Sequence, residues 1–131
     1  MPKSLHILVV DDDANMRRTL GDILAISGYQ VEVSASPLEG LLQLEKAAFD
    51  CVISDIRMPG MNGVQFHQVI RQKYDHLPVL LMTAYADQDL LLQARAQGLR
   101  YFLEKPLQLE RLFAWLAEVA AEPELGLGLP E

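Results

Sequence analysis

The stretch DCVISDIRMPGMNG at residues 50–63 places a short apolar run, an aspartate and a loop one after another. The run from Asp50 to Ser54 has the length and apolar character of a buried strand. Pro, Gly and Asn residues then mark a loop, and a helical pattern extends from Gly63 to about Lys73. The stretch therefore predicts one β-strand joined to one α-helix, with Asp55 at the carboxyl end of the strand.

The same succession of a short apolar run and a longer helical stretch occurs five times along the chain. The expected strands are Leu5–Val10, Tyr29–Ser34, Asp50–Ser54, Pro78–Met82 and Arg100–Leu103, and the expected helices are about Ala14–Ser27, Pro37–Ala47, Gly63–Lys73, Asp87–Gln97 and Leu107–Ala121. Such alternation is typical of an α/β fold with a parallel sheet.

Composition indicates one soluble domain. The chain has 131 residues, of which 50% are hydrophobic, so it can bury one core but not two. We expect a domain at 1–121 and a C-terminal tail or linker stub at 122–131, where Pro and Gly are frequent. The net charge of −7 disfavours direct binding to nucleic acid or anionic membrane. The apolar runs are too short for a signal peptide core or a membrane span, and a single cysteine fits a cytoplasmic protein.

Polar side chains follow the expected strands where each strand ends. Aspartates 11–13 follow the first strand, Asp55 the third, Thr83 the fourth and Lys105 the fifth. Parallel α/β sheets bind ligands at this edge, so these groups should gather there. Neighbouring carboxylates repel by roughly 1 to 4 kcal/mol per pair unless a cation lies between them. Mg²⁺ prefers such oxygen ligands, which predicts a magnesium site.

The expected group suits phosphoryl transfer. An aspartate can itself accept the phosphoryl group, and the reaction mainly requires that the phosphoryl oxygens be neutralised. Lys105 could neutralise one oxygen, and the Thr83 hydroxyl or a backbone amide another. Taken singly, each residue has an ordinary interpretation: Asp13 as a helix N-cap, Asp55 as a turn residue, Lys105 as a surface charge. Their occurrence at four strand ends favours the chemical interpretation.

Four motifs carry a resemblance to a known family. VVDDD at 9–13, ISDIRMPGMNG at 53–63, MTA at 82–84 and EKP at 104–106 resemble, in this order, the motifs of receiver domains of two-component response regulators. The resemblance extends from Leu5 to about Ala121. It implies a flavodoxin-like (βα)5 three-layer sandwich with a five-stranded parallel sheet of order 2-1-3-4-5.

The resemblance also implies roles for individual residues. Asp55 would accept a phosphoryl group from a sensor histidine kinase or a phosphotransfer protein, in a signalling protein that catalyses only its own phosphorylation and dephosphorylation. The implied Mg²⁺ ligands are Asp12 and Asp55 directly, Asp11 through water, and the backbone carbonyl of Arg57. Thr83 and Lys105 would bind phosphoryl oxygens, and the bond between Lys105 and Pro106 would be cis.

The resemblance to receiver domains also implies a two-state switch. Thr83 would move toward the phosphate and Phe102 would turn inward, altering a face made by the fourth helix, fifth strand and fifth helix. That face would control an output partner or domain, or form a homodimer on activation. We expect at least one of Leu90, Leu91 and Leu92 to point outward. In the last helix we expect an inward stripe and a flanking Trp115 that either covers the core edge or joins this face; the stripe is Leu109, Leu112, Phe113, Leu116 and Ala120.

Two other classes of protein share part of this pattern. Phosphatases with an aspartate nucleophile carry Asp-x-Asp and a threonine after the first strand, and that threonine is missing from Asp11-Asp12-Asp13-Ala14-Asn15. A binding module without phosphorylation would usually have lost an acidic or lysine position, and none is lost here.

Overall fold

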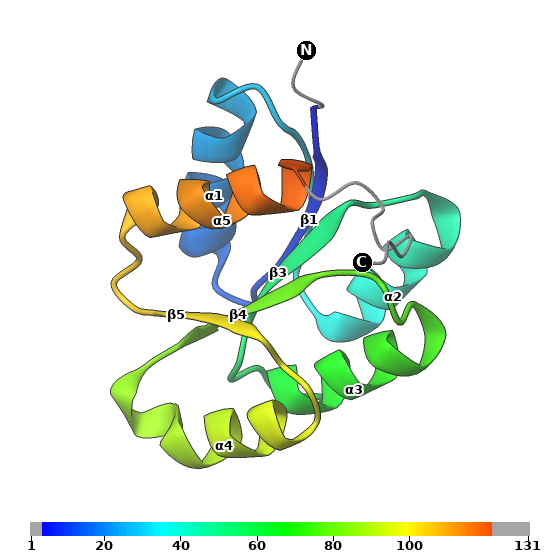
Figure 1. The fold of residues 1–131 in the computed structure, drawn as a ribbon, viewed down its shortest axis with the longest axis vertical. Coiled ribbons are helices and arrows are strands. Elements are labelled where there is room, and N and C mark those ends of the chain that lie inside the picture. The colour runs from blue at the N-terminus through cyan, green and yellow to red at the C-terminus, as the bar shows by residue number, and fades with distance from the viewer. Residues whose placement is uncertain (1–3, 122–131) are drawn as a thin grey trace.

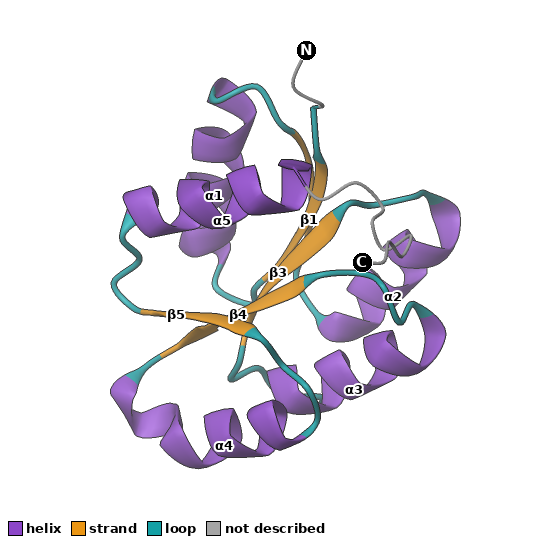
Figure 2. Cartoon of the chain, viewed as in Figure 1, coloured by secondary structure: helices purple, strands orange, loops and turns teal. Residues whose placement is uncertain are grey.

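The computed structural model describes residues 4–121, and the tail expected at 122–131 lies outside this range. Its strands are β1 (His6–Val10), β2 (Gln30–Ser34), β3 (Cys51–Asp55), β4 (Val79–Thr83) and β5 (Tyr101–Glu104). Its α-helices are α1 (Ala14–Ile26), α2 (Pro37–Lys46), α3 (Gly63–Lys73), α4 (Gln88–Ala96) and α5 (Leu109–Ala121), with a 3₁₀ turn, η1 (Tyr85–Asp87), before α4. Figure 2 shows the strict alternation of strands and helices, which the sequence predicted.

The five strands form one parallel sheet in the order β2-β1-β3-β4-β5. Helices α1 and α5 cover one face, and α2, α3 and α4 cover the other (Figure 1). This arrangement confirms the expected flavodoxin-like three-layer sandwich. It brings the carboxyl ends of β1, β3, β4 and β5 to one edge, as any parallel sheet must.

Two apolar layers hold the sheet between the helices. Strands β1, β3 and β4 are buried from both sides, which explains their nearly continuous apolar sequences. One layer packs around Phe66 of α3, which has no exposed surface, and the other around Leu20 and Leu24 of α1. The central strands are therefore the rigid part of the fold, and their ends are well fixed in space.

Helix starts follow local hydrogen bonds. The Asp13 carboxylate caps α1 by accepting from the amides of Asn15 and Met16, and the Ser36 hydroxyl caps α2 by accepting from the Glu39 amide. Helix α5 begins at Leu109, two residues later than expected. The reason is that the Gln108 carbonyl accepts from the amides of Arg111 and Leu112, so Gln108 ends the loop.

The expected inward face of α5 was partly wrong. Leu112 and Leu116 are buried, but Leu109 is 40% exposed. Trp115 is 4% exposed, so of the two positions expected for it, it takes the one that covers the core edge. Trp115 packs on Tyr101 of β5, with ring centroids 5.7 Å apart. Because β5 is an edge strand, the helix turns its largest side chain toward this strand.

Helix α4 agrees with the expectation that at least one of its three leucines points outward, since Leu92 is 65% exposed while Leu91 is buried.

Within residues 4–121, none of the helices combines the length and the apolar character needed to cross a bilayer.

Candidate functional site

The residues expected at the site come from four strand ends at one edge of the sheet. Asp55 is the last residue of β3, and Thr83 is the last residue of β4. Each of these two strands therefore ends one residue later than expected. The register pairs Asp55 with Met82 and Thr83 with Glu104, so these ends are level across the sheet. Asp11 and Lys105 follow directly after β1 and β5.

Three carboxylates form a cluster at this edge. One oxygen from each of Asp11, Asp12 and Asp55 can be chosen such that all lie within 4.8 Å of one another. Asp11 is fully buried and Asp55 is 7% exposed, whereas Asp12 faces solvent. Asp13 is directed elsewhere, because its carboxylate caps α1.

Asp11 is held in a way that leaves one oxygen for a ligand. Its Oδ1 accepts from the Asp13 amide at 2.9 Å, while the buried Oδ2 has no hydrogen-bond partner. Burial raises the pKa of Asp11, and the nearby charges of Asp55 and Asp12 add to this increase against the Asp13 hydrogen bond and the Lys105 charge. A cation among the three carboxylates would satisfy Oδ2 and remove the repulsion. The donor set is made of hard oxygens, as Mg²⁺ requires.

Lys105 supplies the positive charge of the site. Its Nζ lies 3.0 Å from Oδ1 of Asp55. Burial lowers the pKa of this ammonium, but the hydrogen bond and charge of Asp55, with the charges of Asp11 and Asp87, raise it overall. The Lys105 amide donates to the Thr83 carbonyl at 2.7 Å, and the bond to Pro106 is cis. Lysine and threonine are thus fixed relative to each other.

The loop after Asp55 folds tightly onto the strand. The Ile56 amide donates to Oδ1 of Asp55, and the Gly63 amide donates to the Ile56 carbonyl at 2.7 Å. A Cβ atom on Gly63 would lie 2.7 Å from the Ile56 Cα and 2.8 Å from the Asp55 carbonyl oxygen. Only glycine permits this approach, and the Asn62 to Gln65 capping box then starts α3.

A fourth carboxylate, Asp87, lies next to the site, since its charge contributes to the raised pKa of Lys105, although the sequence indicated only a helix start there. It is 4% exposed and accepts from the Ala84 amide at 2.7 Å and from Nε of Arg57 at 2.8 Å. Its position three residues after Ala84 is the spacing of a capping box, which could have indicated the contact with Ala84. Nothing in the sequence pairs it with Arg57.

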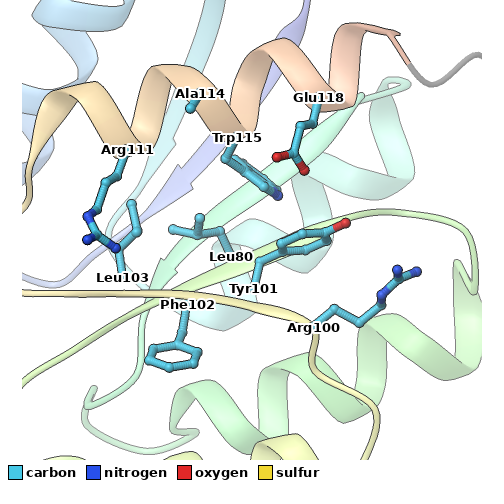
Figure 3. A pocket seen from close by; sticks show the side chains of 9 residues that line it. All are labelled: Leu80, Arg100, Tyr101, Phe102, Leu103, Arg111, Ala114, Trp115 and Glu118. Carbon is cyan, nitrogen blue, oxygen red and sulfur yellow. The ribbon is translucent and has the colours of Figure 1, made fainter.

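Phe102, the expected switch residue, lies on the α4 side of β5. It is half-buried against the core layer of α3 and α4, and the Arg95 guanidinium carbon lies 5.8 Å from its ring centroid. Figure 3 shows Phe102 projecting from the strand to the side opposite Tyr101 and Leu103. The two aromatic residues of β5 therefore contact different helices.

Comparison with known proteins finds relatives that share one family. The model of the response regulator receiver domain family matches residues 7–117. The response regulator protein FleR of Pseudomonas aeruginosa is 41% identical over 114 residues, and the transcriptional regulatory protein FixJ of Bradyrhizobium diazoefficiens is 35% identical over 119. These matches cover 87% and 91% of the chain but only 24% of FleR and 58% of FixJ.

Solved structures of similar size also match. A response regulator receiver domain protein from Clostridium thermocellum superposes with a TM-score of 0.87 at 27% identity, covering 92% of this chain and 98% of that one. The chemotaxis protein CheY4 of Vibrio cholerae gives a TM-score of 0.81 at 33% identity, covering 89% and 99%.

Proposed function

Since the chain belongs to the response regulator receiver domain family of two-component systems, we propose that Asp55 accepts a phosphoryl group and that this modification switches the protein. The observation that carries the proposal is the 3.0 Å contact between Lys105 and Asp55, next to two further carboxylates. The contact supplies both a nucleophile and a cation for the charge that develops on the phosphoryl group.

In the proposed reaction, a carboxylate oxygen of Asp55 attacks the phosphorus of a phosphohistidine on a sensor histidine kinase or a phosphotransfer protein. The new O–P bond forms while the P–N bond breaks, and the electron pair of that bond stays on the imidazole nitrogen. Lys105 binds one phosphoryl oxygen, and the Thr83 hydroxyl or a neighbouring amide binds another. In this role the domain would catalyse only its own phosphorylation and the hydrolysis of its own acyl phosphate.

Asp11, Asp12 and Asp55 are the residues that would hold Mg²⁺, together with the backbone carbonyl of Arg57. Bound Mg²⁺ would neutralise phosphoryl charge and the repulsion among the carboxylates. Support comes from the unpartnered Oδ2 of buried Asp11 and from the purely oxygen donor set.

The output of the switch would pass through α4, β5 and α5. A hollow of about 270 Å³ lies along β5 and α5, with Tyr101, Trp115 and two arginines, Arg100 and Arg111, in its lining (Figure 3). Movement of Thr83 would give Phe102 room to turn inward and would change this face. The face would then bind an output partner or domain, or a second activated copy.

We assign residues 1–121 to the receiver and 122–131 to a linker stub, in a protein that works in the cytoplasm beside its kinase. Because the chain spans about a quarter of FleR and somewhat over half of FixJ, an output domain would be covalently attached in proteins of that design. In this role the receiver itself would contact neither nucleic acid nor a membrane.

Beryllofluoride, which mimics an acyl phosphate, tests the proposal. The fluorescence of Trp115, the single tryptophan, should change on addition of beryllofluoride with Mg²⁺. It should not change without Mg²⁺ or in Asp55→Asn. Acetyl phosphate should add one phosphoryl mass to the wild type only. A wild type that responds to neither reagent would rule out the proposed function.

A further inference from the structure

The ion pair between Arg57 and Asp87 joins two loops that flank the proposed phosphorylation site. Arg57 lies two residues after Asp55, and Asp87 closes the 3₁₀ turn that follows Thr83. Nε of Arg57 lies 2.8 Å from Oδ1 of Asp87, and Oδ2 of Asp87 accepts from the Ala84 amide at 2.7 Å. One carboxylate thus connects the loop after β3 with the loop after β4.

A turn cap alone does not explain this arrangement. Capping of η1 uses Oδ2 only, and an aspartate is almost never fully buried unless its charge is paired. Asp87 is 4% exposed and uses its second oxygen for a residue 30 positions away in the sequence. Its negative charge also reaches the site, since it contributes to the raised pKa of Lys105.

The Ala84 amide is the hydrogen-bond donor through which Asp87 could affect the phosphorylation site. It follows Thr83 directly at the end of β4, so it is a backbone donor at the edge of the sheet where Asp55 lies. Phosphoryl oxygens bind well to backbone amides. In this structure the amide already donates to a carboxylate, which is a strong acceptor.

We propose that Asp87, held by Arg57, competes with the phosphoryl group for the Ala84 amide and thereby opposes phosphorylation of Asp55. This inference rests on the proposed function. Asp87 is a positioning residue: it touches neither the nucleophile nor the donor, and it acts through the amide and through repulsion of the incoming phosphoryl charge. Phosphorylation must release Asp87 from Ala84, which frees the turn before α4 to move.

The test measures beryllofluoride affinity by Trp115 fluorescence at saturating Mg²⁺, in Asp87→Asn and Arg57→Gln. Asparagine keeps the shape but accepts a hydrogen bond more weakly, and the glutamine change leaves the backbone carbonyl of Arg57 in place. Each variant should bind beryllofluoride roughly two- to fivefold more tightly, the factor that corresponds to an ion pair with one largely exposed partner. The double variant should gain less than the product of the two single gains, because both changes release the same carboxylate. Arg57→Lys keeps a positive charge beside Asp87, so its affinity for beryllofluoride should be close to that of the wild type.

Mg²⁺ affinity without beryllofluoride, measured by calorimetry, separates this role from a purely structural one. It should stay within roughly twofold in Asp87→Asn, because the Asp87 side chain does not belong to the cluster of Asp11, Asp12 and Asp55. The matched control is Glu45→Gln, which breaks the Lys73–Glu45 ion pair (3.3 Å) between α3 and α2 and should change neither affinity.

Unchanged or weaker beryllofluoride binding in both variants, with a normal wild-type response, would overturn this inference and leave the proposed function intact. Parallel loss of Mg²⁺ and beryllofluoride binding would also overturn it, since that result indicates a damaged site. A wild type that does not respond would overturn both. Arg57→Gln keeps the test valid if Asp87→Asn fails to fold, because the Arg57 side chain is 63% exposed.

Discussion

The Lys105 ammonium and the Asp55 carboxylate are in direct contact, with 3.0 Å between Nζ and Oδ1. Asp55 ends β3 and Lys105 follows β5, and these strands are not neighbours, since β4 lies between them. The contact therefore depends on the level ends of the strands, and on the Lys105 amide bound to the Thr83 carbonyl. In the proposed function, a lysine fixed in this way would bind a phosphoryl oxygen without a large rearrangement.

Replacing Lys105 with Gln should weaken beryllofluoride binding by roughly tenfold, the loss expected for a partly exposed charge-assisted hydrogen bond. Titration of Trp115 fluorescence at saturating Mg²⁺ measures the effect. Lys46→Gln, which removes a charge from the last turn of α2, is the matched control and should have no effect. Equal affinities of wild type and Lys105→Gln would show that this ammonium does not bind the phosphoryl group.

Replacing Asp11 with Asn should stabilise the protein without Mg²⁺ by about 1 kcal/mol, because it removes one charge from the repelling carboxylates. The sign follows from the raised pKa of Asp11: its stabilising contribution is present below its ordinary value of 3.8 and is lost as pH rises through the higher folded value. At neutral pH the buried charge is therefore unfavourable. Urea unfolding with and without Mg²⁺ measures both states.

In the same experiment, Mg²⁺ should stabilise the wild type clearly more than Asp11→Asn. Its binding to the wild type should also weaken as pH falls toward the raised pKa of Asp11, because protons then compete for the carboxylate. Asp22→Asn, on the exposed face of α1, serves as the control. If Asp11→Asn lost stability and kept the full effect of Mg²⁺, Asp11 would not belong to the metal site.

The sequence predicted the sheet and the principal site residues because both depend on local patterns. Apolar runs marked the strands, and polar residues at their ends marked the edge where Asp11, Asp55 and Lys105 now lie together. Strand order came from the family resemblance, since periodicity alone does not determine which strands are neighbours.

Contacts between distant loops could not be predicted in the same way. Arg57 and Asp87 are 30 positions apart, and each has an ordinary local interpretation as a loop residue or a helix start. The choice between the two positions expected for Trp115 could not be made from the sequence for a related reason: the apolar stripe of α5 is wide, and Trp115 packs on Tyr101 of the neighbouring strand.

Replacing Gly63 with Ala should destabilise the protein by roughly 1 to 3 kcal/mol, the usual cost of overpacking. The added Cβ would lie 2.7 Å from backbone at Ile56, which cannot move without displacing Asp55. Beryllofluoride affinity should fall as well. Gly21→Ala is the control, since its Cβ would meet only the end of the Val33 side chain at 3.3 Å. Equal stability of the two variants would contradict the role given to Gly63.

Replacing Trp115 with Ala should cost about 3 to 5 kcal/mol of stability, as for other buried aromatic residues. This makes it unsuitable for testing self-association, for which exposed Leu92 is the better probe.

Leu92→Ser should change stability by less than about 0.5 kcal/mol. Sedimentation velocity with beryllofluoride and Mg²⁺ then tests whether activated copies pair through α4. If wild type and Leu92→Ser sediment alike in both states, Leu92 takes no part in such pairing.

Replacing His67 with Gln should make the protein more resistant to acid. His67, on α3, is 2% exposed. Burial and the nearby Arg71 charge lower its pKa from 6.5 to about 4, against a hydrogen bond with Gln97, which raises it. A lowered pKa means that stability is retained above 6.5 and lost as pH falls toward 4, because the unfolded chain binds the proton first.

The loss attributable to His67 should be about 2 kcal/mol at about pH 5. Urea unfolding at about pH 7.5 and about pH 5 measures it as the difference between wild type and variant, which cancels the contribution of Asp11. His76→Gln, at an exposed position in the loop before β4, is the control. If wild type and His67→Gln lost equal stability between these pH values, His67 would titrate normally and would not be the acid-sensitive group between α3 and α4.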